Sequence, residues 1–193
     1  RNLLARGSIM EAFAPEANTF RMGFGRINKG SARVDGKDTT VIENSSTYGG
    51  GGVRAFTAPR KVNLFKWLED LPASGGTPLV TAMKAIGDYY SRTDNRGPYT
   101  DDPSTTNTVA DNKTCRRSFH IMMTDGYWNG AAVSVGNVDN TDGPTIVGLG
   151  SSYKYLKTRP FLDGNSNSLA DVAMYYWNHD LQPSMDNAVT PVG

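Results

Sequence analysis

The most informative stretch of the sequence is Ser118-Phe119-His120-Ile121-Met122-Met123-Thr124-Asp125-Gly126. It is an almost continuous apolar run that ends in a carboxylate and a glycine, and it is too short for a typical helix. Apolar residues on both faces are typical of a buried strand in a parallel sheet. Open α/β sheets place their ligand sites at the carboxyl ends of such strands, so we expect Asp125 to lie in that crevice. Gly126 allows the backbone to turn sharply just after it.

The rest of the chain alternates between helix patterns and strand patterns. Apolar residues recur at helical spacing in four segments, which are 2–14, 60–71, 77–92 and a final helix that begins after Ser168. Ser168 and Asp171 form a capping-box pattern at the start of that final helix. Residues 19–28 are predicted as a strand, and the pieces 40–42 and 53–56 as an antiparallel edge hairpin. This alternation predicts an α/β sheet with helices on both faces.

Polar segments without periodicity interrupt these elements. An excursion covers residues 29–52, and two long loop excursions follow at 93–114 and 127–166. Loops of this length in a compact domain are either functional or mobile. We expect one domain over residues 1–183, with 184–193 starting a following segment.

Composition excludes several classes of partner. The 193 residues carry 20 basic and 19 acidic side chains, and this balance gives no support to a nucleic-acid surface. No apolar run is long enough to span a membrane. The first residues already have a mid-helix pattern, so we expect a piece of a longer protein, and the missing signal peptide carries no meaning. Cys115 is the only cysteine, which leaves it as a free thiol or as the partner of a cysteine outside these residues.

Two side chains at the predicted sheet edge carry oxygen atoms that suit a metal ion. Thr77 follows Gly75-Gly76, and Asp125 ends the apolar run. Magnesium prefers oxygen ligands in octahedral geometry and usually keeps several waters, so these two groups would supply part of its coordination shell. The alternatives are a helix N-cap for Thr77, with Pro78 in the first helical position, and a turn carboxylate for Asp125. Three aromatic residues, Tyr127, Trp128 and Tyr153, are candidates for a binding surface near this edge, and core packing is the alternative for each of them.

Five segments together form a recognisable pattern: Phe-Arg-Met-Gly-Phe-Gly-Arg-Ile-Asn (20–28), Leu-Pro-Ala-Ser-Gly-Gly-Thr-Pro-Leu (71–79), Asp-Asn-Arg-Gly-Pro (94–98), Cys-Arg-Arg-Ser-Phe-His-Ile-Met-Met-Thr-Asp-Gly-Tyr-Trp-Asn (115–129) and Leu-Ala-Asp-Val-Ala-Met-Tyr-Tyr-Trp (169–177). Their order and spacing resemble the N-terminal von Willebrand factor A region of type IV pilus tip adhesins of the PilY type. The resemblance covers the chain from about residue 1 to 183.

The resemblance implies a doubly wound, mostly parallel sheet with a metal-ion-dependent adhesion site at its carboxyl edge. Such a site combines an Asp-x-Ser-x-Ser loop, a threonine from a second loop and an aspartate from a third. Thr77 matches the threonine and Asp125 matches the aspartate. No Asp-x-Ser-x-Ser occurs in these residues, so the von Willebrand factor A-like domain is partial, and a bound Mg²⁺ would need ligands from upstream residues.

The same resemblance has a consequence for folding. The first strand of the A-type sheet is central, and it is missing here. Without it, the strands predicted at 19–28 and 118–124 expose unpaired edges. We therefore expect these 193 residues not to fold as an isolated monomer unless other segments supply that strand. A cooperative thermal transition of the isolated chain would contradict this.

By resemblance, the expected function is a non-enzymatic adhesion and assembly module, secreted to the cell surface at the tip of a type IV pilus. Its expected partners are minor pilins or other tip subunits and a host or surface ligand. The alternative is a structural docking scaffold on minor pilins with a vestigial metal site. An aspartate-nucleophile phosphatase is disfavoured, because position 123 holds Met where an Asp-x-Asp motif needs its first Asp.

Overall fold

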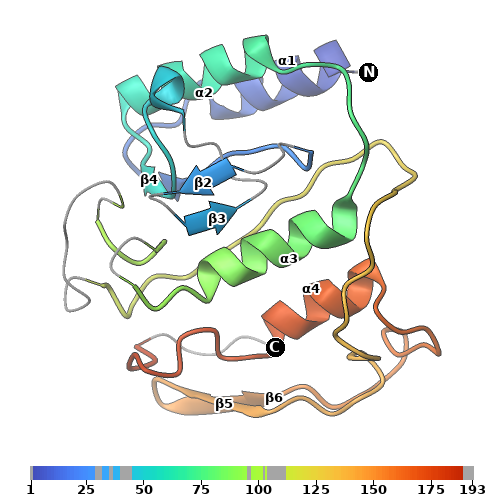
Figure 1. Ribbon diagram of the computed structural model, residues 1–193. Helices are drawn as coiled ribbons and strands as arrows, with labels where there is room; N and C mark the ends of the chain where they lie inside the picture. Colours follow the sequence, from blue (N-terminus) through green and yellow to red (C-terminus); the bar gives the residue numbers. More distant parts are fainter. Residues whose placement is uncertain are drawn as a thin grey trace. The chain divides into compact units, whose positions relative to one another are not determined.

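The computed structural model describes residues 2–28, 32–34, 37–39, 45–94, 97–101, 103 and 112–188 (Figure 1). The chain divides into two compact units. Unit 1 comprises Arg1–Gly75 and Asp94–Asp111, and unit 2 comprises Gly76–Thr93 and Asn112–Gly193. The single domain expected over residues 1–183 stays a prediction.

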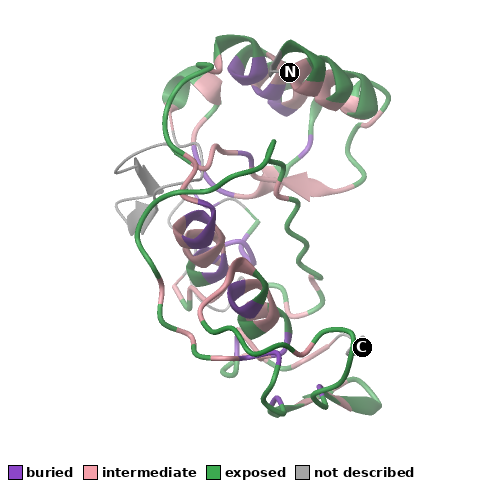
Figure 2. Cartoon of the chain, turned by 90° about the vertical axis from the view of Figure 1, so that its right-hand side faces the viewer, coloured by how far each residue is buried: buried purple, intermediate pink, exposed green. Residues whose placement is uncertain are grey.

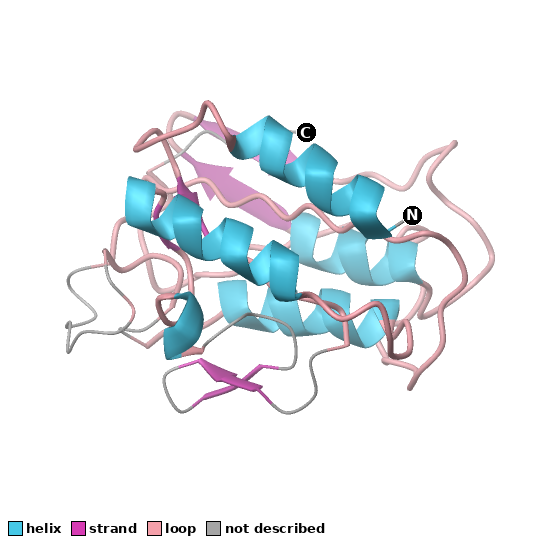
Figure 3. Cartoon of the chain, turned by 90° about the horizontal axis from the view of Figure 1, so that it is seen from above, coloured by secondary structure: helices cyan, strands magenta, loops and turns pink. Residues whose placement is uncertain are grey.

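Two helices dominate unit 1, and they lie side by side in Figures 1 and 3. They are α1 (Asn2–Phe13) and α2 (Ala58–Asp70). Helix α2 begins after Thr57, whose side chain accepts a hydrogen bond from the backbone N–H of Arg60. This contact satisfies one of the N–H groups that have no partner within a helix. Both helices lie where the apolar spacing of the sequence predicted them.

The core of unit 1 is aromatic. Phe56 is fully buried, and its ring stacks on Phe20 with the ring centroids 4.9 Å apart. Phe13 of α1 meets the same ring edge-on at 5.8 Å. On the other side, Phe24 packs against Trp67 of α2 at 5.1 Å. Aromatic rings bury large apolar areas, so this cluster holds both helices against the intervening chain.

The strands of unit 1 are short and antiparallel. Strand β1 (Arg21–Met22) pairs with β4 (Arg54–Ala55), and β2 (Ala32–Val34) pairs with β3 (Lys37–Thr39). A 3-10 helix, η1 (Ser46–Tyr48), precedes β4. The strand predicted over 19–28 is therefore only two residues long. The predicted piece at 53–56 is confirmed, but its partner is β1, and the predicted strand at 40–42 lies outside the described residues.

One stretch of the 93–114 excursion, residues 97–100 together with Pro103, is buried. Thr100 and Pro103 are fully buried, and Tyr99 is nearly so. The guanidinium of Arg21 donates to the carbonyl oxygens of Thr100 and Asp101 and fastens this segment to β1. The sequence, which is polar and aperiodic here, gave no sign of this packing.

Unit 2 is built on a pair of helices, α3 (Leu79–Tyr90) and α4 (Leu169–Trp177), which lie side by side in Figures 1 and 3. Gly87 of α3 faces the ring of Tyr176, and the Tyr176 hydroxyl donates to Asp88 at 2.7 Å. The capping box predicted at the start of α4 is confirmed, because Ser168 and Asp171 exchange hydrogen bonds in both directions. The lack of a side chain at Gly87 allows the two helices to approach closely.

A hairpin completes the regular structure of unit 2. Strand β5 (Thr145–Gly148) pairs with β6 (Ser151–Lys154) through a turn at Leu149 and Gly150. Gly150 has φ +71°, a conformation that glycine adopts without steric cost. Tyr153 and Tyr155 pack edge-on against Trp177 of α4.

The segment 118–124 differs from its prediction. It is assigned to no strand and has no ladder partner among the described residues. Phe119 and Ile121 are 79% and 81% exposed, so the segment is not buried on both faces (Figure 2). The physical reason is that no strand flanks it, since every strand pair in the described part of the chain is a separate antiparallel pair. The doubly wound parallel sheet stays a prediction.

Candidate functional site

Thr77 lies in the loop that leads into α3, and it is half-buried. Its predicted role as the N-cap of that helix is wrong. The N-cap position is Pro78, and no side chain caps the helix. Within the described part of the chain, no hydrogen bond engages the Thr77 hydroxyl. The hydroxyl oxygen is therefore not committed to the helix.

Asp125 lies in an exposed turn of unit 2. The next residue, Gly126, has φ +141°, a backbone conformation that is unfavourable for residues with a side chain. The N–H of Gly126 donates to the hydroxyl of Thr124 at 3.4 Å. The alternative role of Asp125 as a turn carboxylate stays a prediction.

The structure joins the Thr77 loop to the chain that follows Asp125. The backbone N–H of Thr77 donates to Asn129 Oδ1 at 2.9 Å. In return, the backbone N–H of Asn129 donates to the carbonyl oxygen of Thr77 at 3.0 Å. We call this pair of hydrogen bonds the Thr77–Asn129 clasp. It brings Thr77 against a residue four positions after Asp125.

Two glycines make the clasp sterically feasible. A Cβ atom at Gly76 would lie 2.7 Å from Asn129 Oδ1, closer than side-chain carbons come in proteins. A Cβ atom at Gly130 would lie 3.0 Å from the Pro78 side chain. Gly130 also has φ +119°. The two loops therefore touch through positions that carry no side chain.

Sequence reasoning missed Asn129. The Asn-Gly pair at 129–130 is a turn signal, but nothing in its spacing indicates a bond to a residue 52 positions earlier. Of the predicted surface aromatics, Tyr127 is fully exposed and Trp128 is 51% exposed. Tyr153 instead packs on Trp177. Exposed aromatic side chains are enriched where proteins bind partners.

The described residues alone do not fit a magnesium ion. Thr77 and Asp125 offer the hydroxyl and carboxylate oxygens that magnesium prefers. Among the described residues, however, no group of three or more His, Cys, Asp or Glu side chains is arranged to hold a metal. Two oxygen ligands leave most of an octahedral shell unfilled, so further ligands would have to come from other residues.

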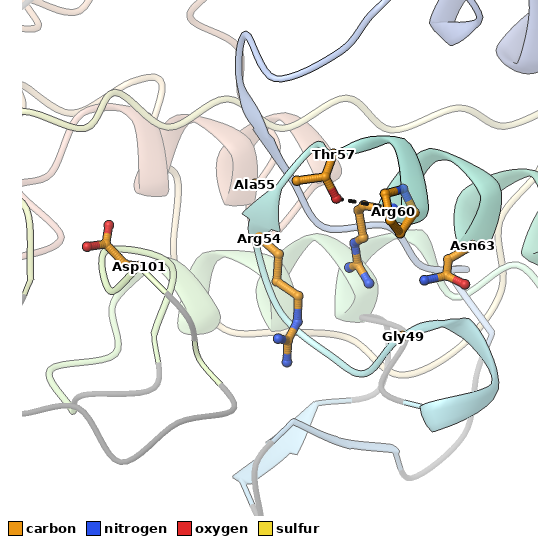
Figure 4. Close-up of a pocket in the computed structure, with 8 residues that line it drawn as sticks. Gly49, Arg54, Ala55, Thr57, Arg60, Asn63 and Asp101 are labelled. Atoms are coloured by element: carbon orange, nitrogen blue, oxygen red, sulfur yellow. Dashed lines mark hydrogen bonds between the residues drawn. The ribbon is translucent and has the colours of Figure 1, made fainter.

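A second candidate is a pocket of about 290 Å³ in unit 1 (Figure 4). It is lined by Gly49, Arg54, Ala55, Thr57, Pro59, Arg60, Asn63 and Asp101. The guanidinium of Arg60 donates to three backbone carbonyl oxygens at 3.0 to 3.2 Å. It also lies 4.5 Å from the centre of the Phe24 ring. These contacts give Arg60 a structural role in holding the glycine-rich loop.

The chain is similar in sequence to known factors of type IV pilus biogenesis. Three relatives from Pseudomonas aeruginosa carry the name type IV pilus biogenesis factor PilY1. The protein of strain PAK is 41% identical over 139 residues, which make up 72% of this chain and 11% of the relative. The PAO1 protein is 40% identical over 180 residues, 93% of this chain and 15% of the relative. The UCBPP-PA14 protein is 41% identical over 154 residues, 79% of this chain and 12% of the relative.

The chain thus spans only 11–15% of the length of the curated relatives that it matches. No protein-family profile matches the chain, and no solved structure matches it. The resemblance to PilY-type proteins is confirmed by these relatives, while its von Willebrand factor A part stays a prediction. Among the described residues, none of the helices has the length and apolar character needed to cross a membrane.

Proposed function

We propose that this chain is a non-enzymatic module of type IV pilus biogenesis, displayed at the cell surface at the pilus tip. The observation that carries the proposal is the 40–41% identity to PilY1 biogenesis factors over 72–93% of the chain. On this proposal, the exposed turn of unit 2 that carries Tyr127 and Trp128 faces minor pilins, other tip subunits or a surface ligand.

The proposed fold is a von Willebrand factor A-like sheet that is completed by segments outside these residues. The apolar run 118–124 supports this. Phe119, Ile121 and Met123 place apolar side chains at alternate positions, the period of one face of a strand, and all three are exposed, as is most of the segment. Strands from elsewhere in the longer protein would pair with this segment and bury those side chains.

We further propose that the same edge mediates metal-dependent adhesion. Thr77 would offer its hydroxyl, directly or through water, and Asp125 its carboxylate, while residues outside this chain complete the set. A bound Mg²⁺ would supply an open coordination position for a carboxylate of the adhesion partner. The uncommitted Thr77 hydroxyl supports this role.

A structural scaffold is the second candidate function. The lack of a metal-holding group among the described residues favours it, and so does the exposed pair Tyr127 and Trp128. In that case the module docks on minor pilins through apolar contacts alone, and the metal site is vestigial. Pilus tip assembly that is unchanged by a chelator would favour the scaffold over the adhesion site.

The test is divalent-cation binding by the full-length protein. We expect Asp125→Ala and Thr77→Ala to weaken Mg²⁺ binding measured by calorimetry. Asp186→Ala, at another exposed carboxylate of unit 2, serves as the matched control and leaves it unchanged. If Asp125→Ala binds Mg²⁺ as the wild type does, the metal role is wrong.

A further inference from the structure

The Thr77–Asn129 clasp has the form of a reciprocal hydrogen-bonded pair. Thr77 donates to the side chain of Asn129 and accepts from its backbone, at 2.9 and 3.0 Å. The Thr77 carbonyl also accepts from the N–H of Leu79 at 2.9 Å, at the first residue of α3. The clasp therefore ties residue 129, four positions after Asp125, to the start of a helix. A helix is a more rigid support than a loop for a binding residue.

We propose that Asn129 is a positioning residue, which holds the segment that follows Asp125 in register with the Thr77 loop. This role rests on the proposed function for its biological purpose, but the contact itself requires no bound ion. Asn129 touches the backbone of Thr77 and leaves its hydroxyl uncommitted. Asn129 therefore acts through Thr77 rather than as a ligand.

The chemistry of the clasp explains why the residue is asparagine. The Thr77 N–H needs an acceptor at the position of Asn129 Oδ1. An aspartate at position 129 keeps an acceptor oxygen at the same reach, whereas alanine has none. The backbone bond from residue 129 to the Thr77 carbonyl is independent of the side chain. Alanine at position 129 should thus remove one of the two hydrogen bonds of the clasp, whereas aspartate should keep both.

The lack of a side chain at position 76 allows a second, independent test of the clasp. A Cβ atom there would collide with Asn129 Oδ1 at 2.7 Å. Gly76→Ala should therefore disturb the clasp from the other loop without changing any hydrogen-bonding group. Gly136→Ala is not a clean control, because Gly136 has φ +83°. Gly164→Ala is suitable, since no atom lies within 4 Å of its Cβ position and its φ is unremarkable.

The experiment measures hydrogen exchange by mass spectrometry on the full-length protein. We follow the peptides that cover residues 76–80 and 124–130. Asn129→Ala and Gly76→Ala are expected to speed exchange at Thr77 roughly three- to tenfold, the effect of losing one net hydrogen bond. Asn129→Asp restores slow exchange. Asn165→Ala, which removes an exposed amide elsewhere in unit 2, and Gly164→Ala leave these peptides unchanged.

The result also separates this inference from the proposed metal role. Unchanged exchange in Asn129→Ala, or no rescue by Asn129→Asp, overturns the positioning role of Asn129. If the wild type does not bind Mg²⁺ in calorimetry, the proposed metal site is wrong. The clasp is unaffected by that result, because hydrogen exchange alone tests it. Where the wild type binds Mg²⁺, Asn129→Ala should bind it at least threefold more weakly. Unchanged affinity would contradict the positioning role.

Discussion

The ring of Tyr176 on α4 occupies the space that a side chain at Gly87 of α3 would fill. A Cβ atom at position 87 would lie 2.3 Å from the ring carbon atoms. The same tyrosine donates its hydroxyl hydrogen to Asp88, the next residue on α3. The packing of the two helices in unit 2 thus depends on one absent side chain and one hydrogen bond.

Gly87→Ala should therefore destabilise unit 2. The added methyl group forces either the tyrosine ring or the helix to move, and overpacking of this kind costs about 1–3 kcal/mol. The measurement is hydrogen exchange of peptides from α3 and α4 in the full-length protein. Gly7→Ala in α1 is the control, because no atom lies within 4 Å of that Cβ position and alanine favours a helix. Equal effects of the two substitutions would contradict the packing.

The Tyr176–Asp88 contact should make the stability of the protein fall with rising pH in the alkaline range. Burial, together with the hydrogen bond and the charge of Asp88, raises the pKa of Tyr176 above its ordinary value. The folded state therefore favours the neutral phenol. This stabilisation is fully present below pH of about 10, the pKa of an unfolded tyrosine, and is lost as the pH rises above it.

Tyr176→Phe isolates this effect in urea unfolding of the full-length protein. The variant should be less stable than the wild type near pH 8, and the difference between them should shrink above pH of about 10. Tyr175→Phe, which removes a more exposed hydroxyl from the same helix, is the control. A difference that stays constant with pH would argue against the raised pKa.

Asp171 should make the stability of the protein depend on pH in the opposite sense, with a loss of stability at acid pH. It is fully buried, and its carboxylate accepts hydrogen bonds from Val138 and from the backbone and hydroxyl of Ser168. Burial alone raises the pKa of Asp171, but these hydrogen bonds outweigh it, so the pKa lies below its ordinary value. The stabilisation is present above pH of about 4 and is lost as the pH falls below that.

Asp171→Asn keeps the shape of the side chain but removes its charge and one acceptor. We expect a loss of about 1–3 kcal/mol at neutral pH, which diminishes below pH of about 4 as the wild-type carboxylate becomes protonated. Urea unfolding measured at acid pH checks this expectation. Asp186→Asn, at an exposed carboxylate, should show no such pH dependence. A loss that persists unchanged at low pH would contradict the role of the charge.

Substitution of Arg60 should destabilise unit 1. Arg60 is buried, and its guanidinium donates to the carbonyl oxygens of Tyr48, Gly50 and Gly52. Arg60→Met keeps the apolar stem but leaves those carbonyls without this donor, at an expected cost of about 2–4 kcal/mol. Hydrogen exchange of peptides from 45–56 is the readout. Lys66→Met removes an exposed pair with Asp70 and a cation–π contact with the Tyr48 ring, so it should speed exchange much less than Arg60→Met, and a similar effect at both positions would contradict the role of Arg60.

The sequence predicted the features that depend on local spacing. The apolar period located the four α-helices of the described residues, and Ser168 with Asp171 indicated the start of α4. These features involve residues within one or two turns of a helix, so their pattern survives in the sequence.

The features that were missed depend on contacts between distant residues. Arg60 has the appearance of a solvent-facing helix residue, and only the fold shows that it reaches three carbonyls of the preceding loop. Asn129 was overlooked for the same reason, because its partner Thr77 lies far away along the chain. The run 118–124 was predicted as a buried strand from its composition alone, which says nothing about whether flanking strands are present.

Ile121 offers the sharpest test of the proposed sheet. It is 81% exposed, and no strand among the residues that the structure describes pairs with its segment. If segments of the longer protein complete the sheet, Ile121 is buried there, and Ile121→Asp should destabilise the full-length protein by more than about 2 kcal/mol, the cost of burying a carboxyl without a partner. Val62→Asp, at a position of α2 that is 65% exposed, should change the stability by no more than about 0.5 kcal/mol. Thermal unfolding of both variants gives the comparison. Equally small effects would mean that the run 118–124 remains uncovered and that the proposed sheet is wrong.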